Sequence, residues 1–448
     1  MSLPAYPAYR DSGVEWLGPI PQHWEVDRLK RRCNVFPSNV DKKAVGGEAA
    51  VRLCNYTDVY YRDDIMSDIP FMEATASKDQ IDKFTLKAGD TIFTKDSETA
   101  DDIGIAAFVP KDMPGVVCGY HLSIARPRSG VDGAYVKRLF DMHYTKACFA
   151  VLANGLTRVG LNQYAVDNIE LPWPPPEEQS RIAAFLYRET GKIDGLIADQ
   201  EKLLALLAEK RQATISHAVT KGLNPNAPMK DSGIPWLGEV PAHWRVTPLK
   251  FIATVQTGIA KGKDIAGKET ITVPYLRVAN VQDGHLALDD IATIDIEPEQ
   301  LERYLLRAGD VLMNEGGDFD KLGRGAIWNG QIEDCIHQNH VFAVRPHSVS
   351  SSWLNQVTSS QYAQFYFMGR SKQSTNLASI SSTNIMELPV VMPPPDEQGR
   401  ILLFVDDERA KIDALAQAAD HAIDLLKERR NSLISAAVTG KIDVRNAV

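Results

Sequence analysis

Apolar residues recur in a heptad-like rhythm in two long segments of the chain. In the first segment, from about 177 to 220, they are spaced by four and three residues, and the rhythm returns 219 residues later in the second. A seam sustained over several heptads is typical of a coiled coil rather than of a short surface helix. We predict that the following positions form the helix-helix seam: Ile182, Leu186, Ile193, Leu196, Leu203, Leu207, Ile401, Val405, Ile412, Leu415, Ala422 and Leu426.

The rest of the chain has a different pattern, in which short β-rich runs alternate with turn residues. Residues 1–173 and 223–392 both contain apolar and β-branched runs that are bounded by Gly, Pro, Asn and Asp. Such runs predict short strands, accompanied by a few helices such as 135–152 and 352–370. We therefore expect two mixed, β-rich globules.

Three motifs show that the chain is an internal repeat. DSGVEWLGPIPQHWEVDRLK recurs as DSGIPWLGEVPAHWRVTPLK with 12 of 20 positions identical. PPPEEQSRI recurs as PPPDEQGRI, and LLAEKRQATISHAVT recurs as LLKERRNSLISAAVT. The matched segments are 11–30 with 231–250, 174–182 with 393–401, and 206–220 with 425–439. Between these motifs the two halves diverge strongly, which indicates a shared scaffold that carries two different inserts.

Proline clusters mark the start of both long helices. Pro174–Pro176 and Pro393–Pro395 cannot continue a strand ladder, and acidic residues follow in the first turn, where the helix dipole favours them. One helix alone has nothing to cover its apolar stripe, and a duplicated unit that closes on itself usually adopts two-fold symmetry. The sequence therefore predicts an α+β fold in which an antiparallel coiled coil of two long helices separates two β-rich globules with pseudo-two-fold symmetry. The predicted domains are 1–173 (first globule), 174–222 (first spacer helix), 223–392 (second globule) and 393–448 (second spacer helix and tail).

Composition narrows the class of protein. The chain is 44% hydrophobic and 24% charged, no apolar run approaches the roughly 18 residues of a membrane span, and its start lacks a charged-then-apolar leader pattern. The five cysteines are scattered and form no CxxC pair, which predicts reduced thiols in a cytoplasmic protein. A net charge of −9 at pH 7 counts against a free-standing, non-specific nucleic-acid binder.

The sequence carries no recognisable catalytic motif. It lacks the glycine-rich turn and the Asn/Asp-Pro-Pro-aromatic loop that an adenine methyltransferase would need. Residues 262–269 nearly spell a P-loop, but Glu269 replaces the metal-binding hydroxyl. His337 and His340 have a spacing that points strand side chains to opposite faces, so core or loop histidines are expected rather than a zinc site, and the matching His121 suggests packing. We expect a non-enzymatic chain without metal or cofactor.

In combination, the repeated motifs resemble those of the specificity (S) subunits of type I restriction-modification systems. WLGxxPxHWxVxxLK opens each half, PPPxEQxxI begins each helix and ExRxxxISxAVT closes it. VPYLRVANVQDG, at 273–284, is similar to a frequent sequence at the start of a target-recognition domain in that family. The resemblance covers the whole chain in order.

The resemblance implies a set of partners. Each target-recognition domain would read one half of an asymmetric, bipartite site in double-stranded DNA. The helices would set the gap between the half-sites and dock two methyltransferase (M) subunits. Methylation of adenine with S-adenosylmethionine would belong to the M subunits, and cleavage with ATP and Mg to restriction (R) subunits. No membrane partner is implied.

Polar residues of the diverged segments are the candidates for DNA contact. Arg, Lys, Asn and Gln reach base edges, and hydroxyl and backbone NH groups contact phosphates. The candidates are Arg52, Asn55, Tyr56, Lys95, Ser97, Thr157 and Arg158 in the first half, and Arg277, Asn280, Asn314, Lys321, Arg324, Gln338, Asn339, Lys372 and Asn376 in the second. For any single residue, an ordinary turn or surface role is an equal alternative.

The repeated tryptophans point away from base contact. Trp16, His23 and Trp24 belong to the shared motif, whereas contacts that read different sequences should differ between the halves. We expect them to pack each globule against the helices. One rival interpretation of the whole chain remains, a coiled-coil adaptor with two protein-binding globules, and the acidic net charge is its best support.

Overall fold

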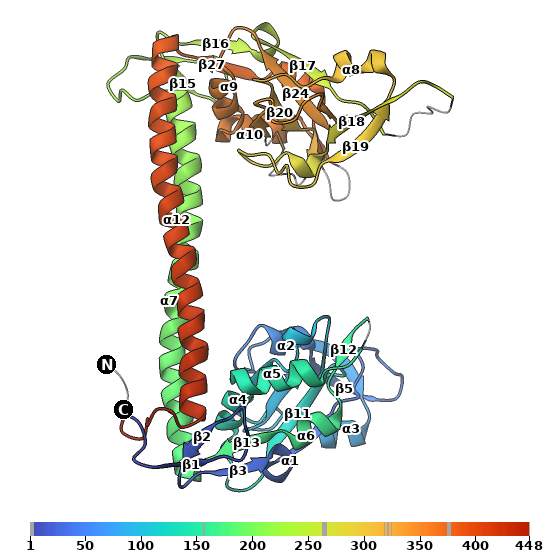
Figure 1. The fold of residues 1–448 in the computed structure, drawn as a ribbon, viewed down its shortest axis with the longest axis vertical. Coiled ribbons are helices and arrows are strands. Elements are labelled where there is room, and N and C mark those ends of the chain that lie inside the picture. The colour runs from blue at the N-terminus through green and yellow to red at the C-terminus, as the bar shows by residue number, and fades with distance from the viewer. Residues whose placement is uncertain are drawn as a thin grey trace. The chain divides into compact units, whose positions relative to one another are not determined.

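The computed structural model describes residues 4–155, 157–261, 267–317, 319, 322–323, 325–373 and 378–447. The chain forms two compact units: unit 1 comprises Met1–Glu201 with Asp420–Val448, and unit 2 comprises Lys202–Ala419. Both units combine small sheets with helices (Figure 1), as the predicted α+β class requires. Because the division falls inside the two long helices, the four-part division of the chain stays a prediction.

Unit 1 is built on a four-stranded antiparallel sheet and a three-stranded mixed sheet. The four-stranded sheet has the order β4 (Cys33–Pro37), β11 (Leu122–Pro127), β7 (Thr91–Thr94), β9 (Ala106–Phe108). The three-stranded sheet has the order β10 (Val116–Cys118), β5 (Ala49–Cys54), β6 (Met72–Ala76), with β10 parallel to β5. Two-stranded pairs are β1 (Tyr9–Asp11) with β2 (Pro19–Pro21), β3 (Glu25–Arg28) with β13 (Glu170–Trp173), and β8 (Asp96–Ser97) with β12 (Val159–Gly160). The short helices are α1 (Leu29–Arg32), α2 (Tyr56–Tyr60), α3 (Lys78–Phe84), η1 (Ala100–Asp102), α4 (Gly133–Asp141), α5 (His143–Leu152) and α6 (Gln163–Asn168).

The core of unit 1 continues from the globule into the long helices. β7 is buried along its whole length, because it lies between β11 and β9 and is contacted by α4. Phe93 of β7 packs in one cluster with Phe140 of α4, Ile182 and Ile434, and the last two residues belong to the long helices. One hydrophobic cluster therefore joins the globule to the helix ends, and a second cluster lies within the globule.

Unit 2 repeats this strand order. Its sheets are β17 (Ala253–Thr257), β24 (Val341–Pro346), β20 (Val311–Asn314), β22 (Gly325–Ile327), and β19 (Ala292–Ile296), β18 (Ile271–Leu276), β23 (Ile336–His337). The two-stranded pairs are β14 (Met229–Asp231) with β15 (Glu239–Pro241), and β16 (Arg245–Pro248) with β27 (Pro389–Met392). One difference is a three-stranded ribbon of β21 (Gly316–Gly317), β26 (Ala378–Ser379) and β25 (Lys372–Gln373), where unit 1 has two strands. The short helices are η2 (Leu249–Phe251), η3 (Val278–Asn280), α8 (Pro298–Tyr304), α9 (Ser351–Thr358), α10 (Gln361–Arg370) and α11 (Ser382–Met386).

The helices predicted at 135–152 and 352–370 are each broken into two. Met142 has an extended backbone conformation between α4 and α5 and is buried. Ser360, between α9 and α10, is also buried, and its hydroxyl donates to the carbonyl oxygen of Val357. The apolar periodicity continues across both breaks, so the sequence alone gave one helix where packing requires two.

Two long helices begin at the predicted proline clusters. They are α7 (Pro176–Lys221) and α12 (Pro395–Val438), each with two acidic residues in its first turn. In unit 1, the first part of α7 packs on the last part of α12, and Asp194 pairs with Arg430 at 2.8 Å. In unit 2, the last part of α7 packs on the first part of α12, and Arg211 pairs with Asp413 at 3.4 Å. Within each unit the two segments thus run antiparallel.

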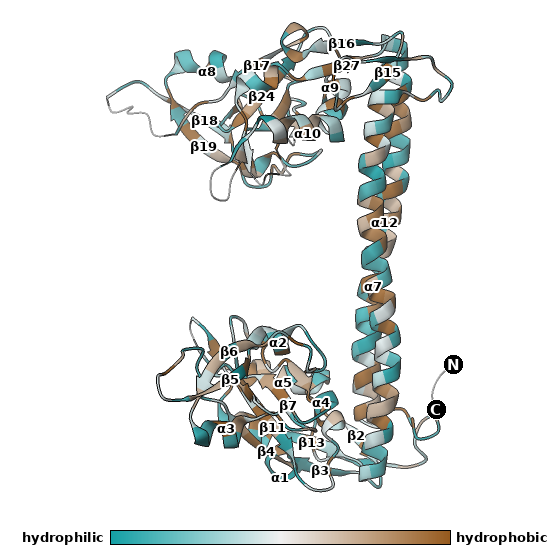
Figure 2. Ribbon diagram, turned by 180° about the vertical axis from the view of Figure 1, so that it is seen from behind, coloured by the Kyte–Doolittle hydropathy of each residue, from teal (hydrophilic) through white to brown (hydrophobic). Residues whose placement is uncertain are grey.

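The seam of this helix pair differs by one residue at several places from the predicted one. Figure 2 shows apolar and polar residues alternating along both helices. The predicted residues that are buried are Ile182, Leu186, Ile193, Leu207, Ile401, Val405 and Ile412, while Ala422 and Leu426 are half-buried. The prediction is wrong for Leu196, Leu203 and Leu415, which are 50%, 39% and 54% exposed.

Their neighbours occupy the seam instead. Ile197 and Leu204 are half-buried in place of Leu196 and Leu203, and Ile423 is buried next to Ala422. Adjacent apolar residues give two possible phases to a heptad pattern, and contact with the partner helix decides between them.

In the part of the chain that the structure describes, no helix combines the length and the hydropathy that a membrane crossing requires.

Candidate functional site

Each globule is fastened to a long helix by a tryptophan and a histidine of the repeated motif. In unit 1, Trp24 Nε1 donates to Glu178 Oε1 at 3.1 Å, and His23 Nε2 lies 2.8 Å from Glu178 Oε2. In unit 2, Trp244 Nε1 and His243 Nε2 lie 3.0 and 2.7 Å from Glu397 Oε2. Both glutamates belong to the PPPxEQ motif. The expected packing of these residues against the helices is confirmed.

Trp16 does not share that role. Its side chain is 80% exposed, whereas the repeated Trp236 is 39% exposed and lies near the rings of Phe365 and Tyr366. The expectation that the whole motif packs on the helices is therefore wrong for Trp16.

A buried aspartate anchors an inner strand of the four-stranded sheet in each unit, β7 or β20. Several candidate DNA-contacting residues follow the end of this strand. Asp90 is fully buried before β7, and both of its oxygens accept hydrogen bonds from Arg126 at 2.7 Å. Asp310 and Arg345 repeat the same bidentate pair in unit 2. Hydrogen bonding to Asp310 raises the pKa of Arg345 above its usual value, so the guanidinium keeps its charge.

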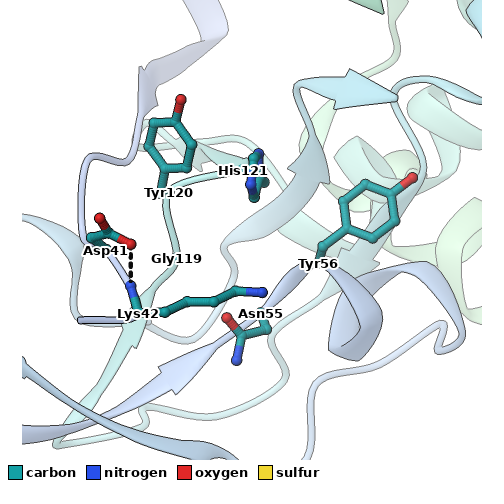
Figure 3. Close-up of a pocket in the computed structure, with 7 residues that line it drawn as sticks. All are labelled: Asp41, Lys42, Asn55, Tyr56, Gly119, Tyr120 and His121. Atoms are coloured by element: carbon teal, nitrogen blue, oxygen red, sulfur yellow. Dashed lines mark hydrogen bonds between the residues drawn. The ribbon is translucent and has the colours of Figure 1, made fainter. Parts of the chain in front are cut away.

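A polar pocket of about 340 Å³ lies at the end of these strands in unit 1 (Figure 3). Its lining residues are Asp41, Lys42, Asn55, Tyr56, Gly119, Tyr120 and His121. Figure 3 shows Lys42 directing its ammonium group toward Asn55. Two predicted residues, Asn55 and Tyr56, are thus brought together with Tyr120 and His121, which the DNA-contact prediction did not include.

Tyr56 belongs to a small aromatic cluster on α2. Its ring stacks on Tyr60 with 5.4 Å between centroids, and Tyr60 packs edge-on against the exposed Tyr61. The Tyr60 hydroxyl donates to Asp102 at 2.7 Å, and this hydrogen bond raises the pKa of Tyr60 to about 12. Neutral aromatic faces at a pocket rim can stack on nucleobases.

Lys95 and its neighbours lie beside the pocket. Lys95 Nζ donates to the Ser38 carbonyl oxygen at 3.2 Å and lies 4.8 Å from the Tyr120 ring centroid. Burial lowers the pKa of Lys95. Thr157 and Arg158 are exposed, and Arg158 Nε lies 3.2 Å from Asp96 Oδ1.

Two candidates of unit 1 are placed elsewhere. Ser97 is 2% exposed, so we withdraw it as a DNA-contacting residue. Arg52 is exposed but does not line the pocket; its guanidinium donates to the Pro114 carbonyl oxygen and lies 6.0 Å from the Phe71 ring. Residue type alone does not distinguish Ser97 and Arg52 from the other predicted DNA-contacting residues.

In unit 2, two predicted asparagines have structural roles. The amide of Asn280 donates to the carbonyl oxygens of Ala287 and Asp290, both at 2.9 Å, and accepts from the Arg277 backbone. Asn314 is also buried, and its amide donates to the Val281 carbonyl oxygen at 2.8 Å. We withdraw both residues as DNA contacts. Arg277 is half-buried, and its guanidinium pairs with Asp290 at 3.0 Å.

The remaining candidates of unit 2 lie on the turn before β24 and on β25. The backbone NH groups of Gln338 and Asn339 donate to the carbonyl oxygens of Leu276 and Ile259. Both residues are half-buried. Lys372 is exposed on β25. Lys321, Arg324 and Asn376 lie outside the described residues, as does most of the P-loop-like segment 262–269.

The histidines expected to face opposite ways do so. His337 is fully buried, its Nδ1 donates to the Val341 carbonyl oxygen at 2.7 Å, and burial lowers its pKa to about 4. His340 points outward and its Nδ1 lies 2.7 Å from Glu315 Oε2. The packing role expected for His340 from its match to His121 is wrong, because its side chain is 56% exposed. Within the described ranges, no three His, Cys, Asp or Glu residues are grouped as metal ligands.

Comparison with known proteins is consistent with this arrangement. Residues 23–199 match a family described as Type I restriction modification DNA specificity domain. The EcoKI specificity subunit of Escherichia coli is 23% identical over 341 residues, covering 73% of this chain and 68% of that subunit. The MjaVIII specificity subunit of Methanocaldococcus jannaschii is 22% identical over 439 residues, covering 95% of both. Residues 23–199 thus match the DNA specificity domain of type I restriction-modification systems, and nearly the whole chain is similar to specificity subunits of those systems.

Solved structures of this family share the fold. A chain from a structure titled as the basis of complex assembly and conformational transition of the type I R-M system aligns with a TM-score of 0.68 and 18% identity, covering 94% of this chain and 98% of that one. The HsdS subunit from Thermoanaerobacter tengcongensis aligns with a TM-score of 0.50 and 19% identity, with the same coverage. The repeated motifs thus lead to a specificity-subunit fold despite low identity.

Proposed function

We propose that this specificity subunit recognises an asymmetric, bipartite sequence in double-stranded DNA, with one globule reading each half-site. One observation carries the proposal. The two units share a strand order but have different side chains at equivalent positions, just before β11 and β24. Gly119 and Gln338 make the same backbone hydrogen bond, to Cys54 and Leu276. Next to them, unit 1 presents Tyr120 whereas unit 2 presents Asn339.

This difference matters because base edges are read by side-chain chemistry. An aromatic rim and an amide-rich rim on the same scaffold would select different bases. Two identical rims would instead read a palindrome. The acidic net charge of the chain is compatible with this role if partner subunits supply part of the phosphate contact.

We further propose that α7 and α12 act as a pseudo-two-fold antiparallel spacer, which sets the gap between half-sites and docks two M subunits. Several large apolar side chains on these helices remain exposed in their own unit, namely Tyr187, Leu196, Leu206, Leu403, Leu415 and Leu425. Exposed apolar groups of this size on a helix surface favour a protein partner. The equivalent ends of the two helices would offer two equivalent docking surfaces.

The chemistry belongs, in this proposal, to the partners. The M subunits would bind S-adenosylmethionine and transfer the methyl group to adenine, and R subunits would use ATP and Mg for cleavage. The residues described above bind and orient DNA and protein, and no step of transfer is assigned to them.

Co-expression with a candidate M subunit, followed by mapping of methylated adenines in genomic DNA, tests this function. We expect a gapped, two-part motif that disappears when this chain is omitted. Replacing residues 30–170 with the equivalent segment of another specificity subunit should change one half-site and leave the other intact. A stable complex without any methylated motif would instead support the adaptor, the rival that the net charge of −9 favours.

A further inference from the structure

Both units carry an imidazole paired with a carboxylate at the end of an inner strand of the four-stranded sheet. In unit 1, His121 Nδ1 lies 2.9 and 3.0 Å from the two Asp96 oxygens. In unit 2, His340 Nδ1 lies 2.7 Å from Glu315 Oε2. Each histidine comes shortly before the strand, β11 or β24, that pairs with the central strand of the sheet. The pair is therefore a shared feature of otherwise diverged surfaces.

The carboxylate comes from different backbone positions in the two units. The backbone NH of Lys95 donates to the His121 carbonyl oxygen, and that of Glu315 donates to the His340 carbonyl oxygen, so Lys95 and Glu315 are equivalent. Asp96 is the next residue along the chain. The imidazole position is thus constant, and a carboxylate reaches it from either of two neighbouring residues.

The turns that carry His121 and His340 do not depend on the imidazole–carboxylate pairs for their conformation. Backbone hydrogen bonds already join both turns to the neighbouring strands, at 3.1 Å from Lys95 to His121 and 2.9 Å from Glu315 to His340. The imidazoles lie toward the surface, since the His340 side chain is 56% exposed and His121 lines the open pocket. A purely structural role would leave both rings with little reason to face solvent.

The carboxylate sets how each ring can bind. A carboxylate on Nδ1 fixes the orientation of the ring, and a ring that is protonated on both nitrogens presents its Nε2–H as a charged donor. Among the described residues, the Asn339 amide lies 3.4 Å from His340 Nε2, beyond good hydrogen-bond distance. Such a donor suits an anionic oxygen.

Other charged groups surround the pair. In unit 1 they are Lys95 beside the Tyr120 ring, Arg158 on Asp96, and Asp41 and Lys42 across the pocket. Arg158 offsets the charge of Asp96, so that carboxylate does not repel an approaching anion. In the described part of unit 2, Glu315 is the charged group that contacts His340.

We propose that His121 and His340 each donate Nε2–H to a phosphate of the DNA backbone, one in each half-site. This inference rests on the proposed function. Two half-sites differ in their bases but share the sugar-phosphate backbone. A feature that is constant between two diverged readers therefore fits the constant part of the ligand, while the unlike neighbours Tyr120 and Asn339 fit the variable part.

The test measures binding of the full chain, in complex with its M subunits, to a duplex with the mapped motif and to a scrambled duplex. At pH 6, His121→Gln and His340→Gln should each weaken binding to both duplexes by the same factor, about fivefold at 0.15 M salt, since one phosphate contact changes log K by about 0.9 per tenfold change in salt. The salt slope should fall by about 0.9 for each variant. The difference between variant and wild type should shrink as pH rises, because a ring whose Nδ1–H faces the carboxylate donates from Nε2 only when both nitrogens are protonated.

Matched variants separate the alternatives. His347→Gln is the control, because His347 lies beyond the other end of β24 and contacts Ser348. His121→Lys should restore the salt slope and abolish its dependence on pH. A loss confined to the motif duplex would assign His121 to a base and overturn the proposal, as would unchanged binding at pH 6. Equal, salt-insensitive binding of both duplexes by the wild type would instead overturn the proposed function itself.

Discussion

The indole Nε1 of Trp24 donates to Glu178 Oε1 at 3.1 Å, across 154 residues of sequence. The same carboxylate accepts from the Tyr6 hydroxyl at 2.5 Å and contacts His23. Burial, followed by this contact with Glu178, raises the pKa of Tyr6 well above its usual value. One glutamate at the start of α7 therefore joins the opening motif of unit 1 to its long helix.

Trp24→Ala should destabilise unit 1 by about 3–5 kcal/mol, because the ring is almost fully buried and the Glu178 carboxylate loses a donor. Chemical denaturation of the chain measures the change. Trp16→Ala is the matched control from the same motif, and its effect should stay within about 0.5 kcal/mol because that ring is exposed. Equal effects of the two substitutions would contradict the role of Trp24.

The corrected seam makes a prediction about two neighbouring residues of α7. Ile193→Ala should cost about 2–4 kcal/mol, since Ile193 is 6% exposed. Leu196→Ala should cost well under about 1 kcal/mol in the isolated chain. If Leu196→Ala proved as costly as Ile193→Ala in denaturation experiments, the heptad phase predicted from sequence, which places both residues in the seam, would be the correct one.

The buried imidazole of His337 predicts a pH dependence for unit 2. Burial lowers its pKa to about 4, whereas an imidazole in an unfolded chain titrates near about 6.5. The unfolded state therefore binds the proton first, and the stabilisation, present in full above pH 6.5, is lost as pH falls toward 4. The loss should reach about 3 kcal/mol, at about 1.4 kcal/mol per pH unit.

Denaturation of unit 2 at pH 7, 5.5 and 4.5 tests this titration. NMR of a chain labelled at histidine should show the His337 ring neutral at pH 5.5 in the folded state. A protonated His337 at that pH in the folded chain would refute the prediction.

The proposed spacer predicts the outcome of a helix insertion. Adding about four residues, roughly one turn, to α7 near its middle should lengthen the gap of the methylated motif and leave both half-sites unchanged. Mapping of methylated adenines measures both features in one experiment. A changed half-site with an unchanged gap would be incompatible with helices that set the spacing.

Much of the fold could be predicted because its signals are local. The proline clusters and the acidic residues after them marked the first turn of α7 and α12, since both effects act within a few residues of the helix start. The breaks at Met142 and Ser360 were missed, because neither residue type ends a helix by its own propensity. At both places the path of the chain over the core ends the helix.

The candidate surface could be predicted only in part. Asn55 and Asn280 follow equivalent strands and looked alike in sequence. Asn55 lines a pocket, whereas the segment from Ala287 to Asp290 covers Asn280 and uses its amide for its own carbonyl groups. Residue type did not reveal this difference, because no local sequence pattern indicates that the segment from Ala287 to Asp290 folds over Asn280.

The sequence by itself determined the repeat, the helical period and the family resemblance, since these are written in the order and spacing of residues. Tertiary structure decided which of two adjacent apolar residues, Leu196 or Ile197, faces the partner helix, and which polar side chains remain at the surface. It also brought His121 to Asp96, 25 residues away. Burial and pairing depend on neighbours distant along the chain, and only packing selects those neighbours.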